Sequence, residues 1–140
     1  MKVLTLGTFD PPHPGHVGLF SQCRRIAQGG EVVVAVNADQ FILNYRGKPP
    51  LMSETDRAGV IAGFRDVDRV VINRELLGQP MLIETVAPDC IVIGQDWALK
   101  DYLAQLRITQ RWLDERNIQL CYVPRTGDWS STEIKSAVGA

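Results

Sequence analysis

The chain has 140 residues, which is enough for one domain with a hydrophobic core and too few for two ordinary domains. A formal net charge of −1 gives no electrostatic reason to expect nucleic acid or an anionic membrane as a partner. No apolar run approaches the roughly 20 residues that span a bilayer, and no signal-peptide pattern precedes the first apolar run, so we expect one domain over residues 1–140 in the cytoplasm.

Apolar runs of strand length alternate with helical patterns along the chain. Strands are expected at residues 2–6, 31–37, 69–73, 90–94 and 119–123. Most of them are continuous apolar runs, which is typical of strands that are buried on both faces of a parallel sheet. Helices are expected at residues 15–28, 53–64, 80–86, 99–115 and 131–138. This alternation predicts a single-domain α/β fold, a Rossmann-like, doubly wound, parallel five-stranded sheet with helices on both faces.

Two further features of the chain order stand out. Residues 39–52 are too long for an ordinary connection and carry two cations, so we expect a functional loop there. The cysteines, Cys23, Cys90 and Cys121, lie in apolar stretches without a Cys-x-x-Cys pair, which favours buried reduced thiols over a disulfide or a zinc site.

The segment from residue 7 to residue 16 joins the first strand to the first helix. Glycines at both ends allow a tight turn, and the start of the helix offers free N–H groups to a phosphate. His13 and His16 lie three residues apart, so both can point at one spot and donate hydrogen bonds to phosphate oxygens. Half of a zinc site and a solvated loop are the alternatives for the two histidines alone. The position of the whole block between strand and helix favours phosphate binding.

This block resembles the signature of the cytidylyltransferase-like nucleotidyltransferase superfamily, the His-x-Gly-His enzymes. Residues 7–10 read Gly-Thr-Phe-Asp and residues 13–16 read His-Pro-Gly-His. Residues 125–132 are similar to the second signature of that superfamily, an Arg-Thr pair before a Ser-Ser-Thr that opens the last helix. Residues 94–97, Gly-Gln-Asp-Trp, resemble the segment after the fourth strand in glycerol-3-phosphate cytidylyltransferases, which by these motifs are the most similar subfamily.

The resemblance implies a reaction in which a phosphate oxygen of an acceptor attacks the α-phosphorus of a nucleoside triphosphate and pyrophosphate leaves. CTP and a small phosphorylated alcohol such as glycerol 3-phosphate are the substrates expected first, with Mg²⁺ carried mainly by the triphosphate and a homodimer as the assembly. The alternative is an adenylyltransferase that uses ATP on a nicotinamide, flavin or pantetheine phosphate. A non-catalytic nucleotide-binding module is the alternative of another class, and the histidine pair argues against it.

The resemblance also assigns roles by position. The catalytic residues are expected to be His13, His16, Lys48 and Arg125. The nucleotide-binding residues are expected to be Gly7, Thr8, Phe9, Asp10, Gly15, Gly94, Asp96, Trp97, Arg125, Thr126, Ser130, Ser131 and Thr132, with Asp10 also a candidate Mg²⁺ ligand. The acceptor-binding residues are expected to be Asp39, Arg46, Arg57 and Arg65. Simple packing or a solvated position is the alternative for Trp97, Arg46 and Arg57.

Two departures from the family pattern concern the choice of substrates. Asp128 and Trp129 stand where the family has Gly-Ile, and Gln95 replaces the first residue of the usual Asp-Asp-Trp. We therefore expect the information on base and acceptor choice to lie around residues 95–97 and 128–129. The first motif carries little of it.

Overall fold

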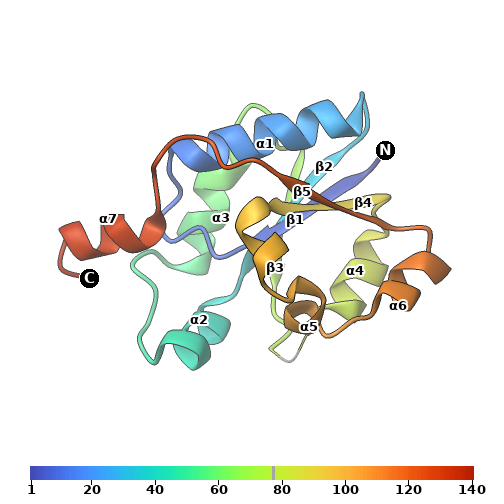
Figure 1. Cartoon of the computed structure of the whole chain (residues 1–140). Coiled ribbons are helices and arrows are strands. Elements are labelled where there is room, and N and C mark those ends of the chain that lie inside the picture. Colours follow the sequence, from blue (N-terminus) through green and yellow to red (C-terminus); the bar gives the residue numbers. More distant parts are fainter. Residues whose placement is uncertain (77) are drawn as a thin grey trace.

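The computed structural model describes residues 1–76 and 78–140, and in that part of the chain five parallel strands form one sheet. The strand order β3-β2-β1-β4-β5 confirms the doubly wound arrangement (Figure 1). The strands are β1 (Val3–Gly7), β2 (Val32–Asn37), β3 (Arg69–Asn73), β4 (Cys90–Gly94) and β5 (Gln119–Val123). The helices are α1 (Pro14–Ala27), α2 (Asp39–Arg46), α3 (Glu54–Ala62), α4 (Pro80–Val86), α5 (Tyr102–Leu106), α6 (Gln110–Glu115) and α7 (Ser131–Ala137), with a 3-10 helix η1 (Gln95–Leu99) after β4.

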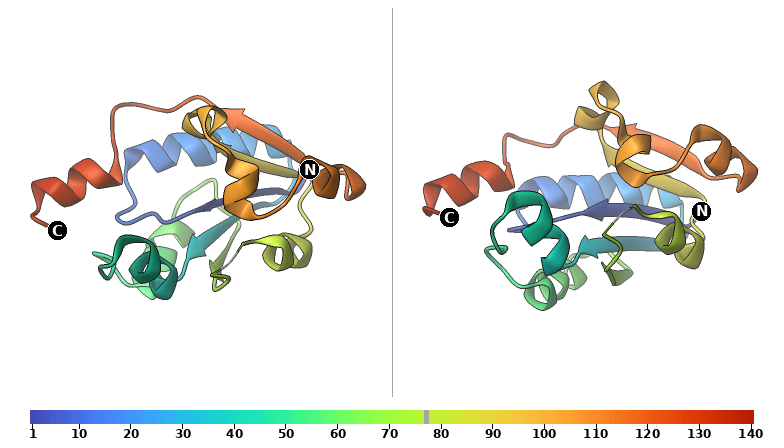
Figure 2. Two further views of the ribbon diagram at one scale, coloured as in Figure 1. Left: turned by 60° about the horizontal axis from the view of Figure 1, so that its bottom comes forward. Right: turned by 90° about the horizontal axis from the view of Figure 1, so that it is seen from below.

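Helices cover both faces of the sheet, because successive side chains of a strand point to opposite faces. In β2, Val33 and Ala35 belong to the hydrophobic cluster that α4, α5 and α6 complete. Val34 and Val36, one residue further along each time, pack with the apolar side chains of α1 and α3. Figure 2 shows the two layers from below. None of the helices in the described part of the chain is long and apolar enough to cross a membrane.

The sheet opens where its strand order reverses, between β1 and β4. These two strands pair only through Val3 with Cys90 and Leu4 with Ile91, near their amino ends. By contrast, β1 pairs with β2 over its full length, as far as Gly7. The carboxyl halves of β1 and β4 are therefore free to diverge, and the crevice between them is where doubly wound folds bind ligands.

The structure corrects the expectation of a long loop at residues 39–52. Its first half is the helix α2, which begins with an acidic residue, Asp39, and ends at Gly47 in the left-handed conformation with φ 74°. These are ordinary helix-end signals. The helix itself was not predicted because Ile42 is its only buried residue, so the sequence shows no helical period of apolar residues there. The remaining segment, from residue 47 to 53, is short.

The expectation of one long helix at residues 99–115 is also wrong. The chain turns at Arg107, which has φ 56° and ends α5, and Thr109 then starts α6 by accepting a hydrogen bond from the N–H of Trp112. Leucines and aromatics at helical spacing occur on both sides of this break, which is why the pattern looked continuous. The break lets the short helices follow the end of the sheet and bury Tyr102, Leu106 and Leu113.

Candidate active site

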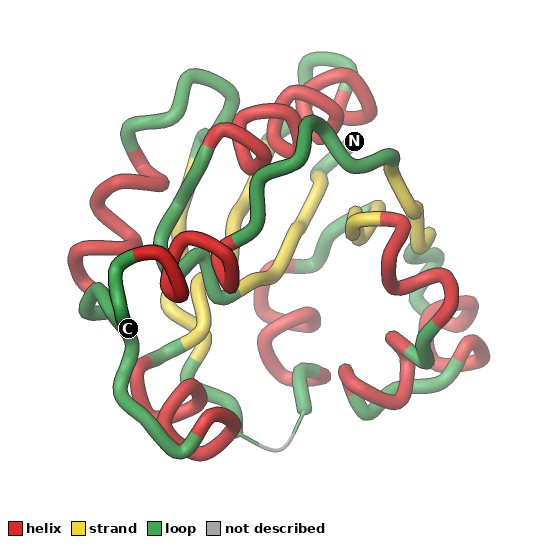
Figure 3. The backbone as a smooth tube through the Cα atoms, turned by 60° about the vertical axis from the view of Figure 1, so that its left-hand side comes forward, coloured by secondary structure: helices red, strands yellow, loops and turns green. Residues whose placement is uncertain are grey.

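Three adjoining cavities are lined by residues at the carboxyl ends of the strands. The tube in Figure 3 shows the course of the chain on this side of the molecule, where its C-terminus lies. The histidine cavity, of about 270 Å³, is lined by His13, Gly15, His16, Leu19, Gly94, Gln95, Asp96, Val123, Pro124, Arg125, Thr126, Ser130 and Ser131. The cationic cavity, of about 360 Å³, is lined by Thr8, Asp10, Phe41, Ile42, Tyr45, Arg46, Ser131, Thr132, Lys135, Ser136 and Ala140. The aromatic cavity, of about 220 Å³, is lined by Leu6, Gly7, Thr8, Asn37, Phe41, Tyr45, Gln79, Ile93, Trp97, Tyr102, Gln105 and Leu106.

The cationic cavity lies between the other two, because it shares Ser131 with the histidine cavity and Thr8, Phe41 and Tyr45 with the aromatic cavity. The row of cavities brings together most of the residues that the sequence assigned to nucleotide and acceptor. A ligand with a charged middle and two less charged ends would fit such a row.

Backbone N–H groups fix the tautomer of the two histidines at the start of α1. Nδ1 of His13 accepts a hydrogen bond from the N–H of Gly15 at 3.1 Å, and Nδ1 of His16 accepts one from the N–H of His13 at 3.0 Å. A neutral imidazole whose Nδ1 accepts a hydrogen bond carries its proton on Nε2. The two rings stack with centroids 3.7 Å apart. Each ring therefore keeps an Nε2–H donor for a ligand.

Burial keeps these rings uncharged near neutral pH. Burial first, and the adjacent His13 ring second, lower the pKa of His16 to about 3. Burial, followed by the positive charge of Arg125, also lowers the pKa of His13 below its ordinary value. The pair consequently offers two neutral donors, and any positive charge for a triphosphate has to come from other side chains.

Small and aromatic residues hold this pair in place. Phe9 is buried with φ 53°, and its ring packs edge-on against His16 at 4.8 Å. A side chain on Gly7 would come within 2.7 Å of the Phe9 ring, and one on Gly15 within 2.8 Å of the His13 ring. The structure thus places Phe9 beneath the histidines, in a positioning role, where the motif alone suggested nucleotide contact.

The segment that leads into α7 forms the opposite wall of the histidine cavity. Arg125 lies 3.5 Å from the carboxylate of Asp96 and donates a hydrogen bond to the carbonyl of Trp129. Thr126 lies so close to α1 that a side chain on Gly18 would come within 2.2 Å of its hydroxyl. The Ser130 side chain accepts a hydrogen bond from the N–H of Glu133 and so caps the start of α7.

Asp10 is fully buried and anchors the segment between α2 and α3. Its two carboxylate oxygens accept hydrogen bonds from the N–H groups of Leu51 and Met52, both at 2.9 Å. Lys135 at 3.4 Å and Arg46 at 3.7 Å supply the opposite charge. The role of Asp10 as a candidate Mg²⁺ ligand stays a prediction, and in the described residues no three acidic, histidine or cysteine side chains form a metal-binding group. A Mg²⁺ ion at this site would be held by phosphate oxygens.

Lys135 is a site residue that the sequence analysis missed. It lies in the cationic cavity beside Arg46, although it comes from the last helix and Arg46 from α2. Its side chain is 12% exposed. The sequence spacing could have indicated this position, because Lys135 follows Ser131 by four residues and therefore lies on the same face of the helix. Arg46 and Lys135 together outnumber the carboxylate of Asp10 in this cavity, and the hydroxyls of Ser131 and Thr132 also line it.

Arg57 is fully buried, and other parts of the protein use its whole guanidinium group. It donates hydrogen bonds to the carbonyls of Thr8, Asn37 and Met52. It also forms an ion pair with Asp39 at 2.7 Å. Arg57 therefore ties together the ends of β1 and β2 and the start of α2. Neither Arg57 nor Asp39 is among the residues that line the three cavities, and the acceptor-binding role expected for them stays a prediction.

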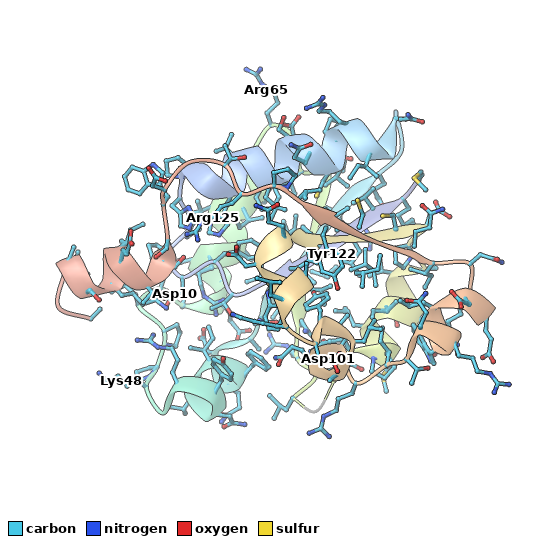
Figure 4. All side chains as sticks on the ribbon, in the orientation of Figure 1. Asp10, Lys48, Arg65, Asp101, Tyr122 and Arg125 are labelled. Atoms are coloured by element: carbon cyan, nitrogen blue, oxygen red, sulfur yellow. The ribbon has the colours of Figure 1, made fainter. Side chains whose placement is uncertain are left out.

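Two of the expected cations lie apart from the cavities. Lys48 is exposed and points away from the molecule (Figure 4). Arg65 is also exposed and lies on the other side of α1 from Asp10 (Figure 4). Its position follows from the topology, because Arg65 immediately precedes β3 and so lies near the amino edge of the sheet, whereas the cavities lie at the carboxyl edge.

The aromatic cavity contains no charged side chain among its lining residues. Trp97 and Tyr102 pack together with ring centroids 5.1 Å apart, while Phe41 and Tyr45 of α2 stack at 6.1 Å. Trp97 therefore lies at this cavity and not at the histidine cavity, where Asp96 and Gly94 remain. Phe41, Tyr45 and Tyr102 line this cavity but were not expected as site residues from the sequence. Phe41 and Tyr45 lie in α2, a helix that the sequence pattern did not predict.

Comparison with known proteins identifies a family model and several named proteins that match most of the chain. Residues 4–137 match the family described as cytidylyltransferase-like. An FAD synthase of Korarchaeum cryptofilum is 35% identical over 138 residues, which cover 95% of this chain and 88% of that protein. An FAD synthase of Methanopyrus kandleri is 29% identical over 98% of this chain and 87% of its own length. The bifunctional protein HldE of Koribacter versatilis is 38% identical over 94% of this chain, but over only 26% of its own length.

Solved structures share the fold. The lipopolysaccharide core biosynthesis protein from Thermoplasma volcanium aligns with a TM-score of 0.65 and 25% identity over 91% of this chain and 98% of that one. TmcAL of Thermotoga maritima aligns with a TM-score of 0.70 over 99% of this chain and 50% of its own. At 15% identity, the second likeness concerns the fold alone.

Proposed function

Because the chain belongs to the cytidylyltransferase-like family and is a nucleotidyltransferase, we propose that it transfers the adenylyl group of ATP to FMN and releases FAD and pyrophosphate. An oxygen of the FMN phosphate forms a bond to the α-phosphorus of ATP. The bond from that phosphorus to the oxygen bridging to the β-phosphate breaks, and pyrophosphate leaves with that oxygen.

The aromatic cavity is the observation that carries this choice of acceptor. Its lining is apolar and aromatic with a few amides and no charge, which suits a flat neutral ring such as that of a flavin. Glycerol phosphate has no apolar body to bury there.

The relatives support the adenylyl donor. FAD consists of FMN joined to AMP, so a protein named FAD synthase transfers an adenylyl group. Two proteins of that name match nearly the whole chain, one of them at 35% identity. CTP with a glycerol phosphate, the pair expected first from the motifs, has less support than this alternative.

The chemistry proposed for the cavities follows from their donors and charges. The histidine cavity would hold the nucleotide, with the Nε2–H groups of His13 and His16 donating to phosphate oxygens as charge builds up in the transition state. Arg46 and Lys135 would neutralise the phosphates in the cationic cavity. Among the described residues that line the cavities, no nucleophilic side chain is paired with a base. We therefore ascribe the catalysis to alignment of the substrates and neutralisation of their charge.

The test is a direct assay of both products. The protein is supplied with ATP or CTP, with Mg²⁺, and with FMN, glycerol 3-phosphate or a sugar phosphate as acceptor, and FAD and pyrophosphate are measured. We expect equal amounts of FAD and pyrophosphate from ATP and FMN. A strong preference for CTP, or for an acceptor without a ring, would overturn the proposal. Absence of pyrophosphate with every pair would favour a binding module.

A further inference from the structure

A chain of buried amides forms the floor of the aromatic cavity at the ends of β1, β2 and β3. Asn73 is 1% exposed and Gln79 is 5% exposed, yet neither has a part in the phosphate chemistry described above. Asn73 donates hydrogen bonds through Nδ2 to Oδ1 of Asn37 and to Oε1 of Gln79. Asn37 in turn donates through Nδ2 to the hydroxyl of Thr8 at 3.1 Å.

The orientation of every amide in this chain follows from one backbone group. The N–H of Glu75 donates to Oδ1 of Asn73 at 3.1 Å, so the Nδ2 side of Asn73 must face Asn37 and Gln79. Both of those side chains must then turn their oxygens toward Asn73. The NH₂ group of Gln79 is left on the side of the aromatic cavity, which Gln79 lines.

The NH₂ group of Gln79 has no hydrogen-bond partner within residues 1–76 and 78–140. The backbone of Gln79 is fixed as well, because its N–H donates to the carbonyl of Leu106 and its carbonyl accepts from Ile83 at the start of α4. The NH₂ group is not among the fully enclosed polar atoms that lack a partner, although Gln79 as a whole is 5% exposed, so this rigidly held donor is open to an acceptor on a ligand in the cavity.

We propose that Gln79 is a specificity-determining residue that donates a hydrogen bond to a ring carbonyl at the edge of the acceptor, presented by the chain of Asn73, Asn37 and Thr8. This inference rests on the proposed function, since it names the part of FMN that the aromatic cavity recognises. The pyrimidine edge of a flavin carries two carbonyl groups, at C2 and C4. No charged residue lines the cavity, so a neutral carbonyl suits this donor better than a carboxylate or a phosphate does.

The far end of the amide chain supports the same orientation of the acceptor. The hydroxyl of Thr8 accepts from Asn37, so its own hydrogen is left to donate, and Thr8 lines both the aromatic and the cationic cavity. A single ligand with a carbonyl-edged ring and a phosphate could thus meet Gln79 at one end and reach Thr8 and Arg46 at the other.

The test compares flavins that differ in one atom. Binding of FMN, 2-thio-FMN and 4-thio-FMN is measured without ATP, by the quenching of flavin fluorescence or by calorimetry for weakly emitting analogues. Sulfur is a poor hydrogen-bond acceptor. We therefore expect the wild-type protein to bind the analogue whose sulfur replaces the carbonyl oxygen facing Gln79, either 2-thio-FMN or 4-thio-FMN, about 10-fold more weakly than FMN. Gln79→Met removes the donor at similar volume and should bind FMN about 10-fold more weakly and lose the discrimination.

Two further variants separate recognition from folding. Gln79→Glu keeps an oxygen for Asn73 and replaces only the NH₂ group, so it should weaken FMN binding while ATP binding is unchanged. Gln119→Met makes the same kind of change at an exposed position at the start of β5 and should bind all three flavins as the wild type does. Equal binding of all flavins by the wild type, or discrimination that survives in Gln79→Met, overturns the inference.

The outcomes also separate this inference from the proposed function. FMN binding that depends on Gln79, without formation of FAD, overturns the proposed function alone. Formation of FAD with binding that ignores Gln79 overturns this inference alone. Absence of FMN binding to the wild type overturns both.

Discussion

His13 and His16 each use Nδ1 for the backbone and leave Nε2 for a ligand. The same division occurs in Gln79, whose oxygen accepts from Asn73 while its nitrogen stays available. In Asp10 and Arg57 the protein itself uses most of the polar atoms, so these two side chains hold the segments of the site together. Whether a side chain binds a ligand therefore depends on which of its atoms the fold has already occupied.

Substitutions of His16 can remove one of its two nitrogens at a time. His16→Asn retains an acceptor near the position of Nδ1 but has no group at Nε2, and we expect turnover to fall about 10²-fold with little change in stability. His16→Gln can place an NH₂ group near Nε2 but loses the bond to the N–H of His13. It should keep more of the turnover and lose more stability. Steady-state kinetics and urea unfolding of both variants measure this, and equal turnover in wild type and His16→Asn would mean that the histidine is structural.

The buried imidazole of His16 also makes the stability of the protein depend on pH. Its pKa is about 3 in the folded protein and about 6.5 when it is unfolded, so between these values the unfolded chain binds more protons. This contribution is present above pH 6.5 and is lost as the pH falls toward 3. We expect the free energy of unfolding to fall more steeply from pH 7 to pH 4 in the wild type than in His16→Asn. Parallel curves for the two proteins would contradict the low pKa.

Many residues of the candidate site could be predicted from the sequence, whereas the contacts between distant segments could not. The motif placed His13, His16, Arg125 and Ser131 around one cavity, because strand-to-helix junctions at the same sheet edge must lie close together. The buried partners of Asp10 could not be predicted, since they come from other segments of the chain.

At the scale of elements, the histidine cavity depends on how closely the segment before α7 approaches α1. Gly18 permits this approach, because any side chain there would overlap Thr126. The contact joins the two halves of the nucleotide site, one at the start of α1 and the other at residues 125–132.

A pair of glycine substitutions tests this contact. Gly18→Ala should push Thr126 away from α1, destabilise the protein by about 1–3 kcal/mol and raise the KM for ATP. Gly59→Ala is the matched control, since Gly59 lies in α3 with nothing within 4 Å of the added carbon and should instead stabilise the helix by about 1 kcal/mol. Thermal unfolding and the KM for ATP are measured for both. An unchanged KM in Gly18→Ala would show that the segment adapts without harm to the site.

The elements themselves were predicted best where they are buried. All five strands were expected at or within a residue of their observed bounds, and for β1, β2 and β4 the reason is burial on both faces, which leaves a continuous apolar run. Helix α2 was missed because a single buried residue gives no period, and the break at Arg107 was missed because a left-handed turn needs no glycine when the flanking helices pack well. Phe41, Tyr45 and Tyr102, which lie in these two regions, also line the aromatic cavity that we propose for the acceptor.

At the scale of the whole molecule, α7 has little support from the rest of the chain. None of its residues is buried, and it extends from the sheet at the side of the cavities (Figures 1 and 2). It is attached by the hydrogen bond from Ser131 to the carbonyl of Pro11 and by the ion pair between Lys135 and Asp10. The same helix supplies Ser131, Thr132 and Lys135 to the cationic cavity, so phosphates bound there would add the contacts that α7 lacks.

Binding of ATP should therefore order α7 more than any other element. A ligand at about 100 times its Kd stabilises the state that binds it by about 2.7 kcal/mol, so the population of open states that disrupt the site should fall about 100-fold. We expect hydrogen exchange of the amides of Ser131–Ala137 to slow on addition of ATP and Mg²⁺. The amides of Gln110–Glu115, which line none of the three cavities, serve as the internal control and should exchange at unchanged rates. In Lys135→Met the protection of α7 should be smaller, because the phosphates lose one of the two cations of that cavity. Equal protection of both helices, or none in α7, would show that the last helix takes no part in holding the triphosphate.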